Sequence, residues 1–396
     1  MLIYYVLLLV IFNSCIETLD PEGLVDDFES VLVIEATITN ELKQHEIRLT
    51  RSFKFEENIT PLESNAEVKV LDDDGNVIRF LESEPGLYLS EEAFEAQPNK
   101  NYRLSITTSD GRNYASDAAQ LTQITPINEV IAQRVINNGE DGMGFFVNTF
   151  DPTNSSKFYR YEFEETYKII APFWRPDDLI TLTDDPIDCF VQEVFVGENN
   201  ERVCYGTNIS NTIILTNTSG LEQDNVSQFL VHFINKNNYI LTHRYSILVR
   251  QFVQSPAAYN FFETLRNLSQ SDNIFSQIQP GLLVGNVFSA NNENEIVLGY
   301  FDVASVSEQR IFFNYTDFFS EEPLPPYVNP CEQFAPPVSL SGTCILANFV
   351  RSGTVEFVSE NPAPNAEFPG PFLVVTDVCG DCTELGSNVV PPFWID

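Results

Sequence analysis

The chain has 396 residues, 43% of them hydrophobic and 12% aromatic, which is enough to bury a core and excludes a disordered protein. It carries 57 acidic and 21 basic residues, for a formal net charge of -36. This charge repels phosphate backbones and anionic headgroups, so it excludes nucleic-acid binding and attachment to a membrane through a basic face.

The first segment has the pattern of a bacterial lipoprotein signal. Met1–Phe12 is an unbroken apolar run, too short for a stable bilayer-spanning helix of about 20 residues and suited to a signal peptide. Ser14 supplies the small residue that the signal peptidase needs before Cys15. We expect a signal peptide over 1–14 and lipidation of Cys15, which anchors the chain. The alternative is an ordinary cleaved signal with an incidental cysteine, and the usual basic residue near the start is missing.

Residues 15–25 form an acidic tether, with Glu17, Asp20 and Glu22 close to the lipidated cysteine. In Bacteroidota-type lipoproteins, a stretch of this kind resembles the signal for export to the cell surface. A hydrated spacer is the other interpretation, and both stay open.

Residues 26–125 have the pattern of an immunoglobulin-like β-sandwich. About seven short segments alternate with period two or are rich in β-branched residues, and turn signals separate them. The expected strands are 31–39, 46–53, 66–71, 77–81, 86–89, 102–107 and a last one around Tyr114. Between two of them, Asp72–Asn76 predicts a solvated Asp-Gly turn rather than a calcium loop, since the distal bidentate glutamate of an EF-hand is absent.

Thr125-Pro126 is a plausible boundary, and 126–396 is expected to be a larger β-rich domain with one amphipathic helix and disulfides. Further strands are predicted at 145–150, 158–163, 212–216, 229–233, 245–252, 282–288 and 295–303. The helix is expected to follow Ser255 as N-cap and Pro256 at its first position. Its apolar residues recur every three or four positions, and the pair Phe261-Phe262 is interpreted as core rather than as a ligand platform. The proline-rich stretch 321–337 is expected to be a loop.

Seven cysteines are present, and an even number remains when Cys15 is set aside. In an exported chain the other six predict three disulfides. These six are Cys189, Cys204, Cys331, Cys344, Cys379 and Cys382. The segment 190–201 contains a turn and has the shape of a hairpin clasped by Cys189–Cys204. The remaining four cysteines allow three pairings.

Two other roles for Cys379-Gly-Asp-Cys382 are less favoured. A zinc site lacks a second CxxC, and His45, His232 and His243 lie in strand-like segments away from any cysteine pair. A redox dithiol normally sits at a strand-to-helix junction, whereas this motif is expected in a terminal loop.

At this point the order of several short motifs resembles an uncharacterised Bacteroidota outer-membrane lipoprotein family, known as a domain of unknown function. The motifs are the lipidation signal, a Val-rich first strand, Gly285-Asn286-Val287 before Val297–Phe301, and a final Cys379-xx-Cys382 with Pro392-Phe393-Trp394. Genes of this family are commonly found beside TonB-dependent receptors. The resemblance implies an outer-membrane lipoprotein that partners such a receptor in nutrient uptake, and it brings no catalytic residue. Cys344 is an addition to the pattern.

No catalytic or cofactor-binding motif is found: GxSxG, HExxH, a P-loop and GxGxxG before a helix are all absent. We therefore expect a non-catalytic protein without metal or cofactor, lipid-anchored in the outer membrane and accessory to a TonB-dependent receptor. The alternative is a surface adhesin or glycan-binding module, suggested by the aromatic content. A hydrolase with paired carboxylates ranks last, because among so many acidic residues no pair can be chosen from sequence.

Overall fold

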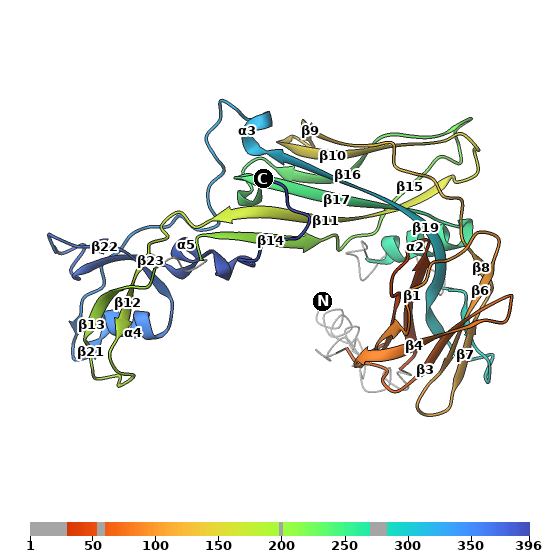
Figure 1. Cartoon of the computed structure of the whole chain (residues 1–396), viewed down its shortest axis with the longest axis horizontal. Coiled ribbons are helices and arrows are strands. Elements are labelled where there is room, and N and C mark those ends of the chain that lie inside the picture. The colour runs from red at the N-terminus through yellow and green to blue at the C-terminus, as the bar shows by residue number, and fades with distance from the viewer. Residues whose placement is uncertain (1–29, 54–59, 198–200, 270–282) are drawn as a thin grey trace, which may run out of the picture.

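The computed structural model describes residues 30–53, 60–197, 201–269 and 283–396. It is built mainly of β-strands, with few helices, which confirms the predicted all-β class. Three β-rich parts follow one another in space: an N-terminal sandwich, a central sandwich and a projecting arm (Figure 1). None of the helices in these residues is long and apolar enough to cross a bilayer.

The N-terminal sandwich is formed by strands close together in sequence. Its strands follow one hydrogen-bonded path, β1-β2-β5-β4-β3-β6-β7, in which β4 pairs with both β5 and β3. Alternate residues point inward in most of these strands; in β1, for example, Leu32, Ile34, Ala36 and Ile38 are buried. The strands are β1 (Leu32–Thr39), β2 (Glu46–Arg51), β3 (Glu67–Asp72), β4 (Val77–Glu84), β5 (Leu87–Ser90), β6 (Asn101–Thr107), β7 (Asn113–Ser116) and β8 (Ala119–Gln120).

The predicted turn after β3 is confirmed. Gly75 adopts φ +87°, and the Asp72 carboxylate accepts hydrogen bonds from the backbone N–H groups of Asp74 and Asn76. Lys100 Nζ lies 3.0 Å from the same carboxylate. The acidic turn is thus held by its own backbone and by one lysine.

Two strands from much later in the sequence complete this sandwich. β18 (Val287–Ser289) pairs with β7, and the first half of β19 (Val297–Asn314) pairs in parallel with β1. Strand pairing therefore crosses the boundary expected at residue 125. The Asn286 side chain closes the gap between the two added strands, because its amide bonds both the N–H and the C=O of Phe301 at 2.8 Å.

β19 belongs to both sandwiches. Its residues up to Ala304 pair with β1, and from Ser305 onward they pair antiparallel with β17. At the changeover, side chains satisfy the free backbone groups: Thr122 Oγ1 accepts from Ser305 N–H, and Asn40 Oδ1 accepts from Val306 N–H. One continuous strand thus fixes the two sandwiches to each other.

The central sandwich packs a sheet of order β14-β11-β17-β19, with β15 also on β11, against the sheet β16-β10-β9. An aromatic-rich core fills the space between them, with Phe145, Tyr161 and Tyr245 fully buried. The strands are β9 (Glu129–Asn137), β10 (Glu140–Asp151), β11 (Phe158–Ile170), β14 (Val203–Ile209), β15 (Ile214–Asn217), β16 (Asp224–Asn235) and β17 (Arg244–Val253). Two short helical segments flank them, η2 (Tyr239–Leu241) and α3 (Tyr315–Phe318).

The predicted helix is confirmed as α2 (Pro256–Ser269). Ser255 Oγ accepts a hydrogen bond from Ala258 N–H at 3.1 Å, as an N-cap should. Phe261 is buried, in agreement with the core interpretation, whereas Phe262 is only partly buried and lines a groove described below.

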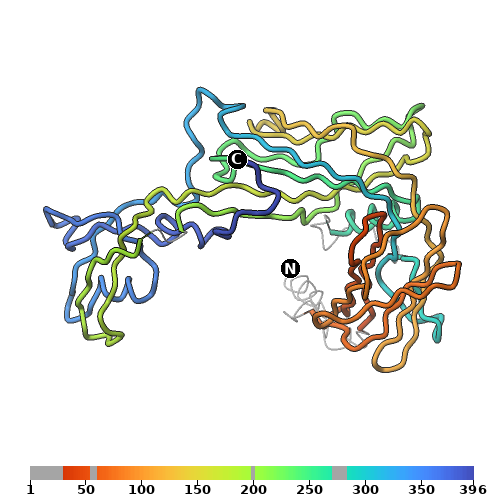
Figure 2. The backbone as a smooth tube through the Cα atoms, viewed as in Figure 1, coloured from red at the N-terminus to blue at the C-terminus, as the bar shows by residue number. Residues whose placement is uncertain are grey.

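The arm projects from one end of the central sandwich, as the backbone trace shows (Figure 2). It combines the segment between β11 and β14 with the chain beyond α3, and 321–337 is a loop with no named strand or helix, as expected. The helix α4 was not expected, since its seven residues are too few for a periodic pattern. The elements are β12 (Asp177–Thr181), β13 (Val191–Phe195), β20 (Ser339–Leu340), β21 (Thr343–Cys344), α4 (Ile345–Arg351), β22 (Val355–Glu360), β23 (Phe372–Thr376), α5 (Asp377–Gly380) and η3 (Cys382–Glu384).

The six predicted cysteines form three disulfides: Cys189–Cys344, Cys204–Cys382 and Cys331–Cys379. The expected Cys189–Cys204 clasp is wrong. The two strands beside these cysteines do not pair with each other, because β13 pairs with β12 in the arm and β14 pairs with β11 in the central sheet. Each disulfide therefore links segments that are distant in sequence.

The final residues lie against the outer face of the central sheet. Trp394 packs edge-on against Tyr205 and Phe312, with ring centroids 4.8 and 5.8 Å away. The Arg310 guanidinium lies 3.6 Å from the centroid of Phe393. The Phe-Trp motif near the C-terminus is thus an aromatic cover over β14 and β19.

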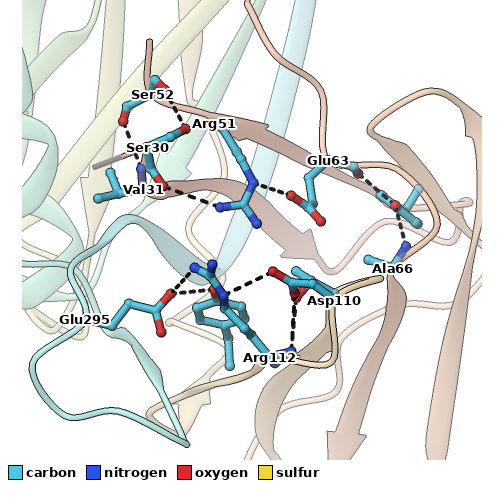
Figure 3. A network of polar contacts seen from close by, with 12 residues as sticks. Ser30, Val31, Arg51, Ser52, Glu63, Ala66, Asp110, Arg112 and Glu295 are labelled. Atoms are coloured by element: carbon cyan, nitrogen blue, oxygen red, sulfur yellow. Dashed lines mark hydrogen bonds and ion pairs between the residues drawn. The ribbon is translucent and has the colours of Figure 1, made fainter. Parts of the chain in front are cut away.

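Polar side chains hold the chain where it enters β1 (Figure 3). Ser30 Oγ donates to Ser52 O at 2.8 Å, and Val31 N–H donates to Ser52 Oγ at 3.0 Å. Arg51 donates to Ser30 O and, through Nε at 2.5 Å, to the buried carboxylate of Glu63. The start of the folded body is therefore fixed by an ion pair with little access to solvent.

Arg51→Met is expected to destabilise the N-terminal sandwich by about 3 kcal/mol, because it leaves the Glu63 carboxylate buried without a cation. The double variant Arg51→Met/Glu63→Gln should recover most of this loss. Lys69→Met, which removes a more exposed pair with Glu67, should cost less than about 1 kcal/mol. Urea unfolding of the variants measures these differences, and equal losses for Arg51→Met and Lys69→Met would contradict the expectation.

Candidate functional site

A groove of about 780 Å³ lies where the two sandwiches meet. Its floor consists of the outward faces of β1 and β19, including Glu35, Leu298 and Tyr300. One wall comes from the central sheet, and the other comes from α2, which contributes Phe261, Phe262 and Leu265. In Figure 1, α2 sits in the corner between β1 and the central strands. The groove exists because β19 holds the two sandwiches at a fixed angle.

An arginine held between aromatic rings forms the wall from the central sheet. Arg160 on β11 places its guanidinium 4.2 Å from the ring centroid of Phe252 and 4.8 Å from that of Phe262. Arg160 is paired with Glu162 on the same strand, while its Nε is buried without a hydrogen-bond partner among the described residues. The guanidinium is thus fixed in position by its neighbours before any ligand arrives.

The groove is richer in positive charge than the rest of the chain. Four basic residues line it, against three acidic ones, in a protein with 57 acidic and 21 basic residues. These basic residues are Lys43, Arg48, Arg160 and Arg250. Within the described residues, Arg48 has no ion pair or side-chain hydrogen bond, and it is exposed. Lys43, Arg160 and Arg250 are paired with carboxylates, so Arg48 is the basic side chain of the described lining that is left open to an anionic group.

At the rim, Glu41 joins Lys43 and Arg250 at 2.8 and 2.5 Å. Burial acts to raise the pKa of the Glu41 carboxyl, but the hydrogen bond from Lys43 and the charge of Arg250 outweigh it and hold that pKa below its usual value. Glu41 is consequently ionised at neutral pH and keeps both cations in place.

The three histidines do not come together. His45 lines the groove but is buried; its Nε2 lies 3.0 Å from Phe94 O, and burial lowers its pKa to about 4. His232 stacks on Phe163 beside Glu165, and His243 is partly buried elsewhere. Among the described residues, no group of three His, Cys, Asp or Glu side chains is placed to hold a metal ion. The described lining of the groove consists instead of charged, aromatic and aliphatic side chains.

The cysteines predicted from sequence to be lipidated or disulfide-bonded are not among the described residues of the groove lining. Cys15 is outside the described residues, and none of the six disulfide cysteines lines the groove. The sequence contains one weak signal for the groove: Arg250 interrupts an otherwise apolar stretch of β17. Arg160 gave no such signal, because it stands among other charged residues of β11.

A second electrostatic feature lies in the arm. Burial, together with the negative charges of Asp178, Asp381, Glu201 and Asp377, raises the pKa of Glu356 on β22 to about 8. The folded protein therefore keeps this carboxyl protonated at neutral pH.

The stability of the arm is expected to fall as pH rises through this range. In the unfolded chain the carboxyl ionises near the ordinary glutamate pKa of 4.5, whereas in the folded protein its pKa is about 8. Each pH unit between these values therefore lowers the free energy of unfolding by up to about 1.4 kcal/mol. Below pH 4.5 the ionisation of Glu356 adds no pH dependence to stability, and above about pH 8 the stability that it has cost stays constant. Glu356→Gln should abolish the fall, while Glu360→Gln, exposed on the same strand, should keep it. Thermal unfolding from pH 4 to 9 tests this, and identical slopes in wild type and Glu356→Gln would contradict it.

A family described as "Domain of unknown function (DUF4249)" matches residues 16–310, about three quarters of the chain. The chain belongs to the DUF4249 family. The match includes all of the groove and the shared strand β19 as far as Arg310. Four of the disulfide cysteines and the final Phe-Trp motif lie beyond it. The resemblance to an uncharacterised family is thereby confirmed.

Other comparisons add little to the DUF4249 match. No curated protein matches the chain. Among solved structures, it is similar to trypsin-activated alpha-2-macroglobulin from Escherichia coli, with 8% identity and a TM-score of 0.17 over 58% of this chain and 15% of that one. It is also similar to a beta-glucuronidase from Parabacteroides merdae, with 9% identity and a TM-score of 0.16 over 48% and 25%. The chain spans a quarter or less of these structures, and such scores carry no argument about fold or function.

Proposed function

We propose that this DUF4249 protein is a non-catalytic capture protein, anchored to the outer membrane by lipid on Cys15 and accessory to a TonB-dependent receptor in nutrient uptake. The observation that carries the proposal is the groove between the sandwiches. Its volume of about 780 Å³ suits a small organic ligand, and its fixed Arg160, exposed Arg48 and aromatic wall suit one that combines an anionic group with an apolar part.

Native mass spectrometry of the protein purified from growing cells tests capture. The wild type should carry a small organic ligand, seen as a mass increment. Leu298→Trp, which fills the groove floor, should lose it, whereas Leu81→Trp on β4, exposed and outside the groove lining, should keep it. A wild-type protein that never carries an increment would contradict capture.

Affinity purification from detergent-solubilised outer membranes tests the partnership. A TonB-dependent receptor should be recovered with the wild-type chain, and repeated recovery of the lipoprotein alone would count against it. The anchor is supported by cysteine pairing: six of the seven cysteines are in disulfides, which leaves Cys15 for lipid. Incorporation of a fatty-acid analogue should be lost in Cys15→Ala.

The glycan-binding alternative gains no comparable support. Every described Tyr and Trp side chain is at least partly buried, so an exposed platform of these residues is not found among them. The proposal therefore rests on the groove.

A further inference from the structure

We infer that the tip of the arm is a docking surface for a protein partner whose matching surface has an apolar centre and a basic rim. The tip is defined by Leu182, Ile187, Phe190, Val338 and Leu340. The inference rests on the proposed function, under which this partner is the TonB-dependent receptor. It assigns the receptor contact to the end of the molecule away from the groove.

The tip exposes large apolar side chains to solvent, which is unfavourable unless another molecule covers them. Ile187 is 82% exposed, Leu182 62%, Leu340 61% and Phe190 52%. They come from two segments that the Cys189–Cys344 disulfide joins, and Phe190 lines the same hollow as Val338, so these side chains lie in one region of the surface. A contiguous apolar patch of this kind is typical of protein–protein contacts.

The patch also contains a hollow for an inserted side chain. A depression of about 310 Å³ lies beside Phe190 and Val338, and its remaining lining is also almost wholly apolar, with Leu346 and Phe372 beneath. An aromatic or aliphatic anchor from a partner fits such a hollow, and anchors of this type supply much of the affinity of an interface.

The patch is held in shape before docking. The loop that carries Ile187 is fixed by the Cys189–Cys344 disulfide and by Arg351, which donates to Thr183 O and Asp188 O. Thr183 Oγ1 in turn donates to the Asp188 carboxylate at 2.9 Å. Binding therefore orders few additional groups, which lowers its entropic cost.

Charge around the patch selects the chemistry of the occupant. Six acidic and no basic residues lie between Pro176 and Glu193, and the nearby Arg351 is engaged by the loop carbonyls. A second copy of this chain would bring the same acidic rim, and anionic lipid would be repelled. A partner with lysines or arginines around an apolar centre is attracted instead.

The test compares three purified chains, wild type, Ile187→Asp and Ile136→Asp, in receptor recovery from outer membranes. Ile136 is 77% exposed on β9 and serves as the matched control. Wild type and Ile136→Asp should recover the receptor, whereas Ile187→Asp should recover at least about tenfold less. With the recovered receptor purified, binding to the wild type should also weaken as salt is raised.

The outcomes separate the inference from the proposed function. If the wild type recovers no receptor, the proposed partnership fails and the docking assignment fails with it. If Ile187→Asp recovers as much receptor as wild type, only the assignment to the tip is overturned. A dimer in analytical ultracentrifugation that Ile187→Asp dissociates would assign the tip to a second copy and overturn the inference. Binding to vesicles of phosphatidylethanolamine and phosphatidylglycerol that Ile187→Asp abolishes would assign it to lipid, with the same result.

Discussion

Gly299→Ala is expected to disrupt the N-terminal sandwich and to destabilise the protein by at least about 4 kcal/mol. Gly299 adopts φ +121°, and a Cβ at this position would lie 2.0 Å from Ile34 O on the neighbouring strand β1. Ile34 O and the backbone of Gly299 belong to the paired strands β1 and β19. Neither can move away from the added Cβ without breaking the hydrogen bonds between these strands.

Urea unfolding and amide hydrogen exchange measure this effect. Protection should be lost in β1 and in the first half of β19, while β17 and the second half of β19 keep theirs. Gly220→Ala is the control, because nothing lies within 4 Å of a Cβ there, and it should change stability by less than about 0.5 kcal/mol.

A milder variant covers the case in which Gly299→Ala does not fold. Asn286→Ala removes the two side-chain hydrogen bonds to Phe301 and should cost about 1–3 kcal/mol. Loss of protection should again begin in β18 and β19. If both variants were as stable as the wild type, the pairing of β18 and β19 with the N-terminal sandwich would not be required for its stability.

Removal of the Cys204–Cys382 disulfide by a double alanine substitution is the second large effect. The bond joins residues 178 apart in sequence, and the chain-entropy model assigns a loop of this length about 5 kcal/mol, less when other disulfides already restrict the chain. Both cysteines are fully buried against the central core, so packing is lost as well. We expect a loss of about 3–5 kcal/mol, with release of the final segment from β14.

The matched control removes Cys189–Cys344 in the same way. That bond braces the tip of the arm, so its loss should increase hydrogen exchange in β12, β13 and α4 and leave the central sandwich protected. Similar exchange patterns in the two double variants would contradict the assignment of Cys204–Cys382 to the central core.

Local pattern accounts for much of the N-terminal sandwich. Period-two alternation locates strands such as β1 and β2 because one face of each is buried. The cap at Ser255 likewise locates α2. These signals depend on a residue's immediate neighbours, which the sequence contains in full.

Pairing between distant segments could not be predicted in the same way. Alternation in β19 shows that it is a strand, but it does not say that Gly299 meets Ile34 while Gln309 meets Val249. The predicted Cys189–Cys204 pair was wrong for this reason, since it relied on proximity in sequence. The groove was missed too, because Arg160 and Phe262 meet only through the packing of α2 on the central sheet.

The shared strand also determines how the body would respond to mechanical load. A pull applied at Ser30 along the axis of β1 acts on a strand that lies parallel to β19 and antiparallel to β2. The hydrogen bonds that join β1 to β2 and to β19 then bear the force at the same time, in shear. β19 passes the same force to β17 and the central sheet. Separation of β1 from the body along this direction therefore requires hydrogen bonds to both neighbouring strands to break together.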